Sequence, residues 1–171
     1  MKKSGMKKGG GRKKFLILEN IRSVHNVGAI FRTADAIGID KIYLVGYTPS
    51  PIDRFGRARQ DLHKAALGAE KNVEWEHVVG ENAADLIGQL KKEGFVIVSI
   101  EQSKNSVDYK KVSNEVSEKD CTILVGNEVD GVSSAVLGAS DFVAEIPMNG
   151  IKESLNVSVA TGIALYGILD R

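Results

Sequence analysis

Residues 146–166 have the sequence IPMNGIKESLNVSVATGIALY, which joins the end of a strand, a glycine-containing loop and the start of a helix. Pro147 lacks a backbone N–H, so the apolar run at 142–146 should end there as a strand. Ser154 or Asn156 can cap the following helix, which is apolar nearly all round and is therefore expected to be buried. A loop of this kind at the carboxyl end of a strand predicts a binding site, although an ordinary strand–loop–helix connection explains this stretch alone equally well.

A second segment joins a predicted buried strand, CTILV at Cys121–Val125, to the polar loop GNEVDG. Gly126 and Gly131 permit backbone conformations closed to other residues and let a ligand approach the main chain. Between them, Glu128 offers an anion or a hydrogen-bond acceptor. Alternatively, it caps the next helix, which is expected to begin near Ser133.

The third segment is NVGAIFRTADAIG, residues 26–38, whose apolar residues recur at helical spacing and whose last residue, Gly38, is a typical helix stop. Arg32 lies away from the apolar stripe, with Asp35 as a possible partner. Most helix arginines are simply solvated. Together with Asn26 at the helix start, however, Arg32 could face a substrate that carries phosphates.

These three segments resemble, in order and spacing, the three motifs of the SpoU (TrmH-type) RNA 2′-O-ribose methyltransferases of the SPOUT superfamily. The resemblance extends from about residue 15 to the end of the chain. It implies an α/β fold with a mostly parallel sheet flanked by helices and a C-terminal deep trefoil knot, an exception to the general avoidance of knots. It also implies S-adenosyl-L-methionine as cofactor, RNA (tRNA or rRNA) as partner, and a homodimer.

The resemblance further implies roles for individual residues. It gives Arg32 the task of activating the ribose hydroxyl. Because a guanidinium has a pKa above about 12, positioning a phosphate and stabilising the oxyanion suits it better than proton abstraction. The expected catalytic residues are Arg32, Asn26, Glu128, Ser154 and Asn156. The expected cofactor-binding residues are Leu124, Gly126, Ile146, Met148 and Leu155. If the last helix forms the dimer, Ala164 is expected to lie in the contact.

Two other functions stay open at this stage, a dinucleotide-binding oxidoreductase and a noncatalytic RNA-binding module that keeps the fold. The oxidoreductase would carry a GxGxxG motif after its first strand, and this chain has none there. The joint presence of all five candidate catalytic residues argues against lost activity. The apparent lack of an extra N-terminal domain slightly favours tRNA over rRNA.

The composition is that of one globular domain: 171 residues, 43% hydrophobic and 26% charged. A single cysteine excludes an intramolecular disulfide, and no apolar run has the length of a membrane span. We therefore expect a cytoplasmic protein that has no membrane partner. The three histidines, at 25, 63 and 77, have no metal-ligand spacing, so no metal site is expected.

Residues 1–14, MKKSGMKKGGGRKK, carry seven positive charges and no acid, which predicts a disordered basic arm ahead of a methyltransferase domain at 15–171. Without the arm, 16 basic residues face 22 acidic ones, so the body is negative although the chain is +1. The arm is expected to supply affinity for phosphates, with a solubilising tail as the alternative.

Within the body, the loop at 46–60 is the best candidate for RNA contact, because it contains two of the three prolines and the arginines Arg54, Arg57 and Arg59. The polar segment 103–120 is expected to be a connection. Other patterns predict strands at 15–18, 41–45, 73–78 and 95–100 and a helix at 83–92.

Overall fold

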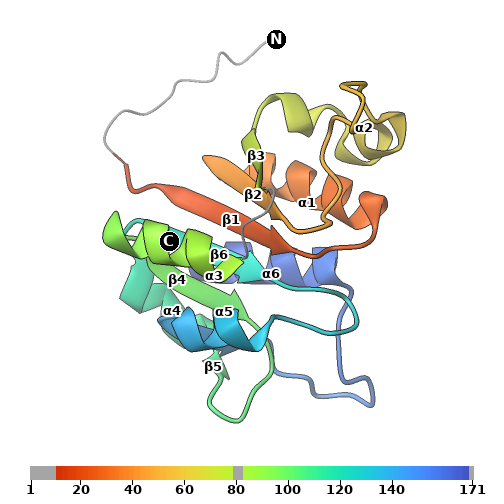
Figure 1. Ribbon diagram of the computed structural model, residues 1–171. Coiled ribbons are helices and arrows are strands. Elements are labelled where there is room, and N and C mark those ends of the chain that lie inside the picture. Colours follow the sequence, from red (N-terminus) through yellow and green to blue (C-terminus); the bar gives the residue numbers. More distant parts are fainter. Residues whose placement is uncertain (1–10, 79–82, 170–171) are drawn as a thin grey trace.

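The computed structural model describes residues 11–78 and 83–169. Its centre is a seven-stranded sheet, in the order β3-β2-β1-β6-β4-β7-β5, in which every strand pair is parallel (Figure 1). The strands are β1 (Lys14–Glu19), β2 (Lys41–Val45), β3 (Glu74–Val78), β4 (Val96–Ile100), β5 (Val107–Asp108), β6 (Cys121–Val125) and β7 (Phe142–Glu145).

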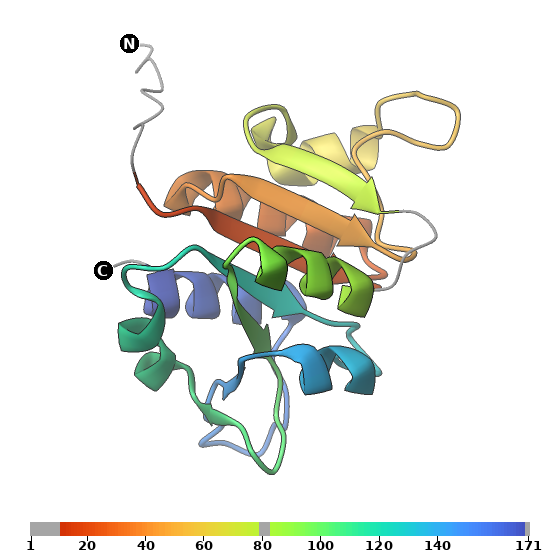
Figure 2. The same cartoon turned by 60° about the vertical axis from the view of Figure 1, so that its left-hand side comes forward.

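Helices cover both faces of this sheet (Figure 2). They are α1 (Val24–Ile37), α2 (Gln60–Ala66), α3 (Ala83–Lys92), α4 (Tyr109–Val116), α5 (Ser134–Ala139) and α6 (Val157–Leu169), with a short 3-10 turn at Ala69–Lys71. Helices α1, α4 and α6 share one core with Leu16 and Leu18 of β1, whereas Ile17 points into the core under α3 and α5. Burial on both faces explains why the central strands are continuous apolar runs.

The sequence-based assignment of elements is mostly confirmed. The strand at 41–45, the strand at Cys121–Val125 and the helix at 83–92 occur with the expected bounds. The assignment of 103–120 as a connection is wrong, because this segment contains β5 and α4. Helix α4 buries only Val112, Ser113 and Val116 in an otherwise polar sequence, so its apolar stripe is too short to stand out.

Helix α6 packs closely but is not buried all round. Gly167 lies directly against the ring of Tyr109 in α4, with no space for a Cβ, so the expected close packing of small residues is confirmed there. Val159 and Tyr166, in contrast, are 49% and 47% exposed, so the expectation of complete burial is wrong for the single chain. Ala164 is fully buried in the core and cannot lie in a contact between copies.

The end of the predicted basic arm belongs to the folded body. The Arg12 guanidinium donates to the carbonyl oxygens of Val116 (2.5 Å) and Leu169 (2.6 Å), which end α4 and α6. Lys14 is the first residue of β1. The remainder of the proposed arm, residues 1–10, lies outside the described residues. Within the described part of the chain, no helix is long and apolar enough to cross a membrane.

Candidate functional site

The sheet has a point where the strand order reverses, between β1 and β6. Strands β2 and β3 lie on one side of it, and β4 and β7 on the other. Open parallel sheets bind ligands outside the carboxyl ends of the strands at such a point. A cavity of about 500 Å³ opens beside this point, at the carboxyl ends of β6, β4 and β7, and is lined by the loops after these strands and by the residues that lead into α6. This volume is typical of small-molecule sites.

The loop after β6 forms a closed backbone turn. Asn127 and Gly131 exchange two backbone hydrogen bonds of 3.1 and 3.0 Å. The Asn127 Oδ1 accepts from the N–H groups of Val129 (2.7 Å) and Asp130 (2.9 Å). Gly131 has φ +70, and a Cβ on Gly126 would collide with the Gly131 carbonyl group. The predicted special backbone conformation is therefore confirmed for Gly131, whereas Gly126 is required by the close approach of the Gly131 carbonyl group and not by its φ.

Two carboxylates hold the entry of α5 beside this loop, and sequence analysis did not single them out. Glu101 Oε2 accepts from the N–H of Val132 at 2.8 Å. The buried Glu19 accepts from the N–H (3.1 Å) and the hydroxyl (2.8 Å) of Ser133. Each acid directly ends or follows an apolar strand, which is the only signal in the sequence that could have identified it.

Glu128 connects the loop after β6 to the start of α1. Its carboxylate accepts from the N–H groups of Arg22 (3.0 Å) and Ser23 (3.3 Å) and from the Asn26 Nδ2 (3.0 Å). The suggestion that Glu128 caps the helix near Ser133 is thus wrong. Partial burial acts to raise the pKa of Glu128, but the hydrogen bonds from Arg22 and Asn26 outweigh it, and the net pKa is lowered. Glu128 is therefore ionised at neutral pH.

Asn156 brings the third segment into the same network. Its Nδ2 donates to the Asn26 Oδ1 at 3.2 Å. Its Oδ1 accepts from the N–H (2.9 Å) and the hydroxyl (2.6 Å) of Ser158, so Asn156 rather than Ser154 caps α6. One chain of hydrogen bonds, Glu128–Asn26–Asn156, thus joins the three segments that the sequence singled out.

The structure brings most of the predicted site residues together. Of the expected cofactor-binding residues, Gly126, Ile146, Met148 and Leu155 line the cavity. Leu124 does not line it, because its side chain is fully buried in the core under α3 and α5.

The predicted catalytic residues divide into three groups. Glu128 and Ser154 line the cavity, and Asn26 and Asn156 adjoin it through hydrogen bonds. Arg32 does not line it. Its side chain is exposed on α1, about 9 Å further along the helix axis than Asn26 at the standard helical rise.

The expected pairing of Arg32 with Asp35 is not found. The Asp35 carboxylate accepts from the Asn72 Nδ2 at 3.3 Å instead, and no ion pair holds Arg32 within residues 11–78 and 83–169. The Arg32 guanidinium is therefore available to a ligand.

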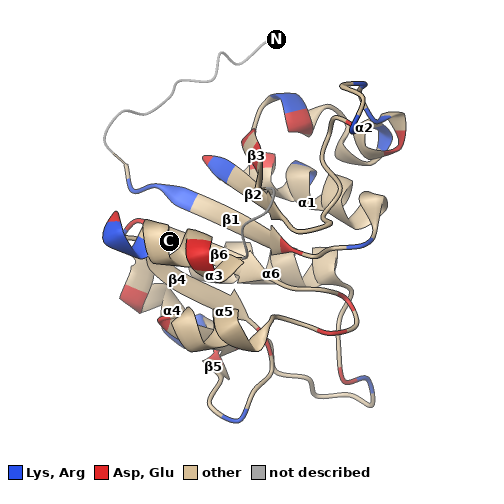
Figure 3. Ribbon diagram, viewed as in Figure 1, with Lys and Arg blue, Asp and Glu red and all other residues tan. Residues whose placement is uncertain are grey.

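The charges around the cavity are mainly negative. Glu101, Glu128, Asp130 and Glu145 line it, beside apolar residues such as Ile146 and Met148. In Figure 3, Lys and Arg positions occur instead around α2 and at the amino end of β1, among other places. In the described part of the chain, no group of three His, Cys, Asp or Glu residues could hold a metal ion. The cavity therefore suits a small ligand that has apolar parts and a positive charge.

Comparisons with known proteins agree with this arrangement. The model of the SpoU rRNA Methylase family matches residues 13–166. A tRNA (guanosine(18)-2′-O)-methyltransferase of Aquifex aeolicus (strain VF5) is 38% identical over 157 residues, which are 91% of this chain and 69% of that protein. A putative TrmH family tRNA/rRNA methyltransferase of Staphylococcus aureus (strain COL) is 35% identical over 156 residues, 91% of this chain and 58% of that protein.

Among solved structures, the AdoMet-bound rRNA methyltransferase from Sinorhizobium meliloti superposes with a TM-score of 0.80 at 29% identity, covering 91% of this chain and 55% of that one. The chain thus spans less than two thirds of the Staphylococcus relative and of this structure. The matched family model covers all three segments that form the site and all seven strands of the sheet. The chain therefore belongs to the SpoU rRNA Methylase family.

Proposed function

We propose that this chain transfers the methyl group of S-adenosyl-L-methionine to a ribose 2′-hydroxyl of RNA. The observation that carries the proposal is the Glu128–Asn26–Asn156 chain of hydrogen bonds at the edge of the cavity, which unites three segments far apart in the sequence. The names of the relatives, which are tRNA and rRNA methyltransferases, support the substrate class. A tRNA is the first candidate, because the Aquifex relative carries that name.

The cavity fits the proposed cofactor. Its walls combine apolar side chains, among them Ile146, Met148 and Leu155, with the backbone of the loop after β6. The carboxylates of Glu101 and Glu145 lie among the lining residues, where they would favour a cationic sulfonium over a neutral ligand. Gly126 lets this loop close against the backbone of Gly131 and Val132. When bound, the cofactor supplies the methyl group.

The residues of the chain would orient the hydroxyl and stabilise the charge that develops on it. Holding two reactants in line contributes roughly 7 kcal/mol or more in well-aligned cases. We assign Arg32 to a phosphate of the RNA and to the developing oxyanion, since a guanidinium stays protonated and is a poor proton acceptor. Asn26 orients the nucleotide, and Ser154 and Asn156 shape the junction between nucleotide and cofactor.

Calorimetric titration tests the proposed cofactor. The purified protein should bind S-adenosyl-L-methionine and not NAD, the cofactor of the oxidoreductase alternative. Methyl transfer from labelled cofactor to unmodified tRNA, with unmodified rRNA in parallel, then tests the reaction, and alkaline hydrolysis locates the methyl group, because a 2′-O-methylated linkage resists it. Cofactor binding without transfer to either RNA would favour the noncatalytic module, and no cofactor binding with RNA present would contradict the proposal.

We also propose that the chain works as a homodimer through the exposed face of α6. Val159 and Tyr166 form this apolar face. Gly162 lies near α1, because a Cβ added to it would be 3.8 Å from the side chain of Thr33. An exposed apolar face of this kind is well placed to bury apolar area in a dimer.

Sedimentation tests the dimer. Tyr166→Glu should give monomers, because a buried unpaired charge costs several kcal/mol. Leu67→Glu is the matched control, since Leu67 is also apolar and exposed but lies at the end of α2, away from α6 (Figure 1). A Tyr166→Glu protein that sediments as a dimer would rule out this face.

The proposal includes the trefoil knot implied by the family resemblance. Helix α6 follows β7, which lies near one edge of the sheet, yet α6 packs against α1 and β6 at its centre. A chain that returns across the sheet in this way can pass through the loop after β6. The knot would be contradicted by an experimental structure whose backbone path reduces to a straight line when its two ends are extended.

A further inference from the structure

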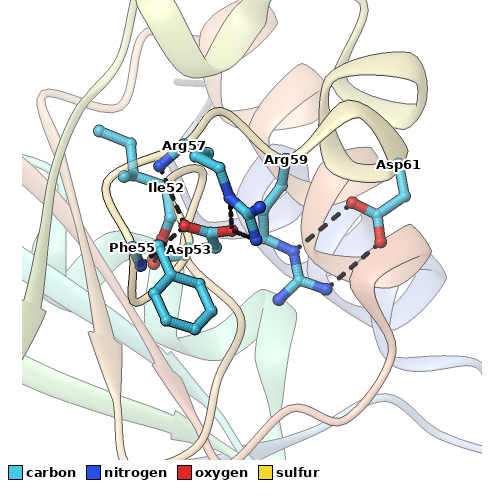
Figure 4. A network of polar contacts seen from close by, with 7 residues as sticks. Ile52, Asp53, Phe55, Arg57, Arg59 and Asp61 are labelled. Carbon is cyan, nitrogen blue, oxygen red and sulfur yellow. Dashed lines mark hydrogen bonds and ion pairs between the residues drawn. The ribbon is translucent and has the colours of Figure 1, made fainter.

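The loop between β2 and α2 is a rigid hairpin, not a loose connection. Ile52 and Ala58 form an antiparallel bridge. The Asp53 carboxylate accepts from the N–H groups of Phe55 (2.8 Å) and Arg57 (2.9 Å) and from the Arg57 Nε (2.8 Å), as Figure 4 shows. Gly56, with φ +78, completes the turn. The tip of the hairpin is therefore held by the Asp53 carboxylate and by backbone hydrogen bonds from Asp53 to Arg57 (2.8 Å) and from Gly56 to Asp53 (2.9 Å).

This hairpin presents an aromatic ring to solvent. Phe55 is 66% exposed, and the guanidinium carbons of Arg54 and Arg57 lie 4.8 and 5.0 Å from its ring centroid. Arg57 is paired with Asp53, so its charge is largely balanced. Arg54 forms no ion pair in the part of the chain that the structure describes. The hairpin thus combines an exposed ring, flanked by two guanidinium groups, with one uncompensated cation.

A hollow of about 410 Å³ adjoins the ring. Phe55, Tyr47 and His77 line it, together with the side chains of Arg54 and Arg59. Arg59 is held by Asp61 through contacts of 3.5 and 3.3 Å (Figure 4). Three rings and two arginines, of which Arg59 is already paired with Asp61, surround one hollow. They suit a flat aromatic ligand that carries negative charge nearby.

A hydrogen bond joins a residue that lines the hollow to a residue that lines the cavity at the strand ends. The Asn127 side chain, in the loop after β6, forms a hydrogen bond with the Tyr47 hydroxyl and donates to the Asn20 carbonyl at 2.9 Å. Asn127 lines the cavity, and Tyr47 lines the hollow. Because β2 is parallel to β1 and β6, both openings lie at the same edge of the sheet.

We infer that this hollow holds an unpaired nucleobase of the RNA, stacked on Phe55, beside the nucleotide that enters the cavity. The inference rests on the proposed function and names how its substrate is held. Stacking on an aromatic ring requires a base that has left its helix, because the bases of duplex RNA are stacked on one another and their deep major groove is closed to side chains. Arg54 contacts the phosphate next to that base. The site therefore selects loops and single-stranded segments over duplex.

The decisive variant is Phe55→Ala, studied with a labelled single-stranded RNA of about 20 nucleotides and with the same strand annealed to its complement. Stacking contributes about 1–3 kcal/mol per base, so Phe55→Ala should bind the single strand roughly 5- to 150-fold more weakly and the duplex as before. Phe55→Trp should keep the preference for the single strand, because it keeps an aromatic face. Leu67→Ala, which removes an equally exposed apolar side chain (67%) outside the hairpin, should change neither affinity.

The salt dependence of RNA binding separates the contribution of the Phe55 ring from that of the Arg54 charge. Arg54→Ala should lower the slope of log affinity against log salt by about 1, whereas Phe55→Ala should leave that slope unchanged. Titration with S-adenosyl-L-methionine, unchanged in both variants, shows that the fold is intact. Wild-type protein that transfers methyl groups to RNA, together with a Phe55→Ala variant of unchanged affinity, would overturn this inference alone. Wild-type protein that binds no RNA would overturn the proposed function with it.

Discussion

Replacing Arg32 with alanine is expected to lower the rate of methyl transfer about 100- to 1000-fold and to leave cofactor binding unchanged. That loss is typical for removal of one group that stabilises a developing oxyanion. Cofactor binding should persist because Arg32 does not line the cavity, and folding should persist because its side chain is exposed and holds no ion pair within the described residues. Single-turnover rates with unmodified RNA and calorimetry with the cofactor measure the two effects separately.

Two further variants sharpen this experiment. Arg32→Lys keeps the charge but not the planar fork of the guanidinium, so a partial recovery of the rate indicates that charge is the main contribution. Lys92→Ala, which removes an exposed cation from α3 on the opposite face of the sheet, should have the wild-type rate. An Arg32→Ala protein whose turnover is near normal would exclude Arg32 from the chemistry.

Gly126→Ala is expected to weaken S-adenosyl-L-methionine binding at least tenfold, or about 1.4 kcal/mol. An added Cβ would meet the carbonyl group of Gly131 and the backbone N of Val132, which are backbone atoms that cannot rotate away. Overpacking of this kind typically costs about 1–3 kcal/mol. The strain falls on the closed turn that forms one wall of the cavity. The turn must therefore open, and this wall changes shape. Calorimetry gives the affinity, and urea unfolding gives the stability.

Gly138→Ala is the matched control. Gly138 lies in α5, and a Cβ there would meet nothing within 4 Å, so this variant should bind the cofactor normally. Wild-type affinity in Gly126→Ala would show that the turn after β6 does not form the wall of the cofactor site. The two variants should lose activity at different steps. Arg32→Ala should bind the cofactor normally but transfer the methyl group slowly, whereas Gly126→Ala should bind the cofactor weakly.

The sequence predicted most of the strands and brought most of its candidate site residues to the cavity or beside it, because their signals are local. A run such as Cys121–Val125 is buried on both faces and therefore apolar throughout. The same property hides the direction in which each side chain points. A continuous apolar run cannot show which residues face the site, and Leu124 faces the core instead. Helix α6 has the same difficulty, since its apolar sequence does not distinguish the buried Ala164 from the exposed Tyr166.

The connections between the segments could not be predicted from local patterns. Glu128 meets Asn26 only because β6 lies beside β1, although four other strands separate β1 from β6 in the chain. Likewise, Asp53 and Phe55 appeared only as neighbours of three arginines in a polar loop. Their hydrogen bonds, which turn that loop into a rigid hairpin, depend on backbone geometry.

The position of β6 also affects how the chain folds while it is being synthesised. Leu16 of β1 pairs with Ile123 of β6, and Val98 of β4 pairs with the same residue from the other side. Until residues 121–125 have left the ribosome, β1 has one unpaired edge and β4 has no partner from earlier in the chain. Unpaired apolar edges invite aggregation in incomplete chains. A nascent chain that stalls before residue 121 therefore depends on chaperones or on the ribosome surface to keep these two edges apart.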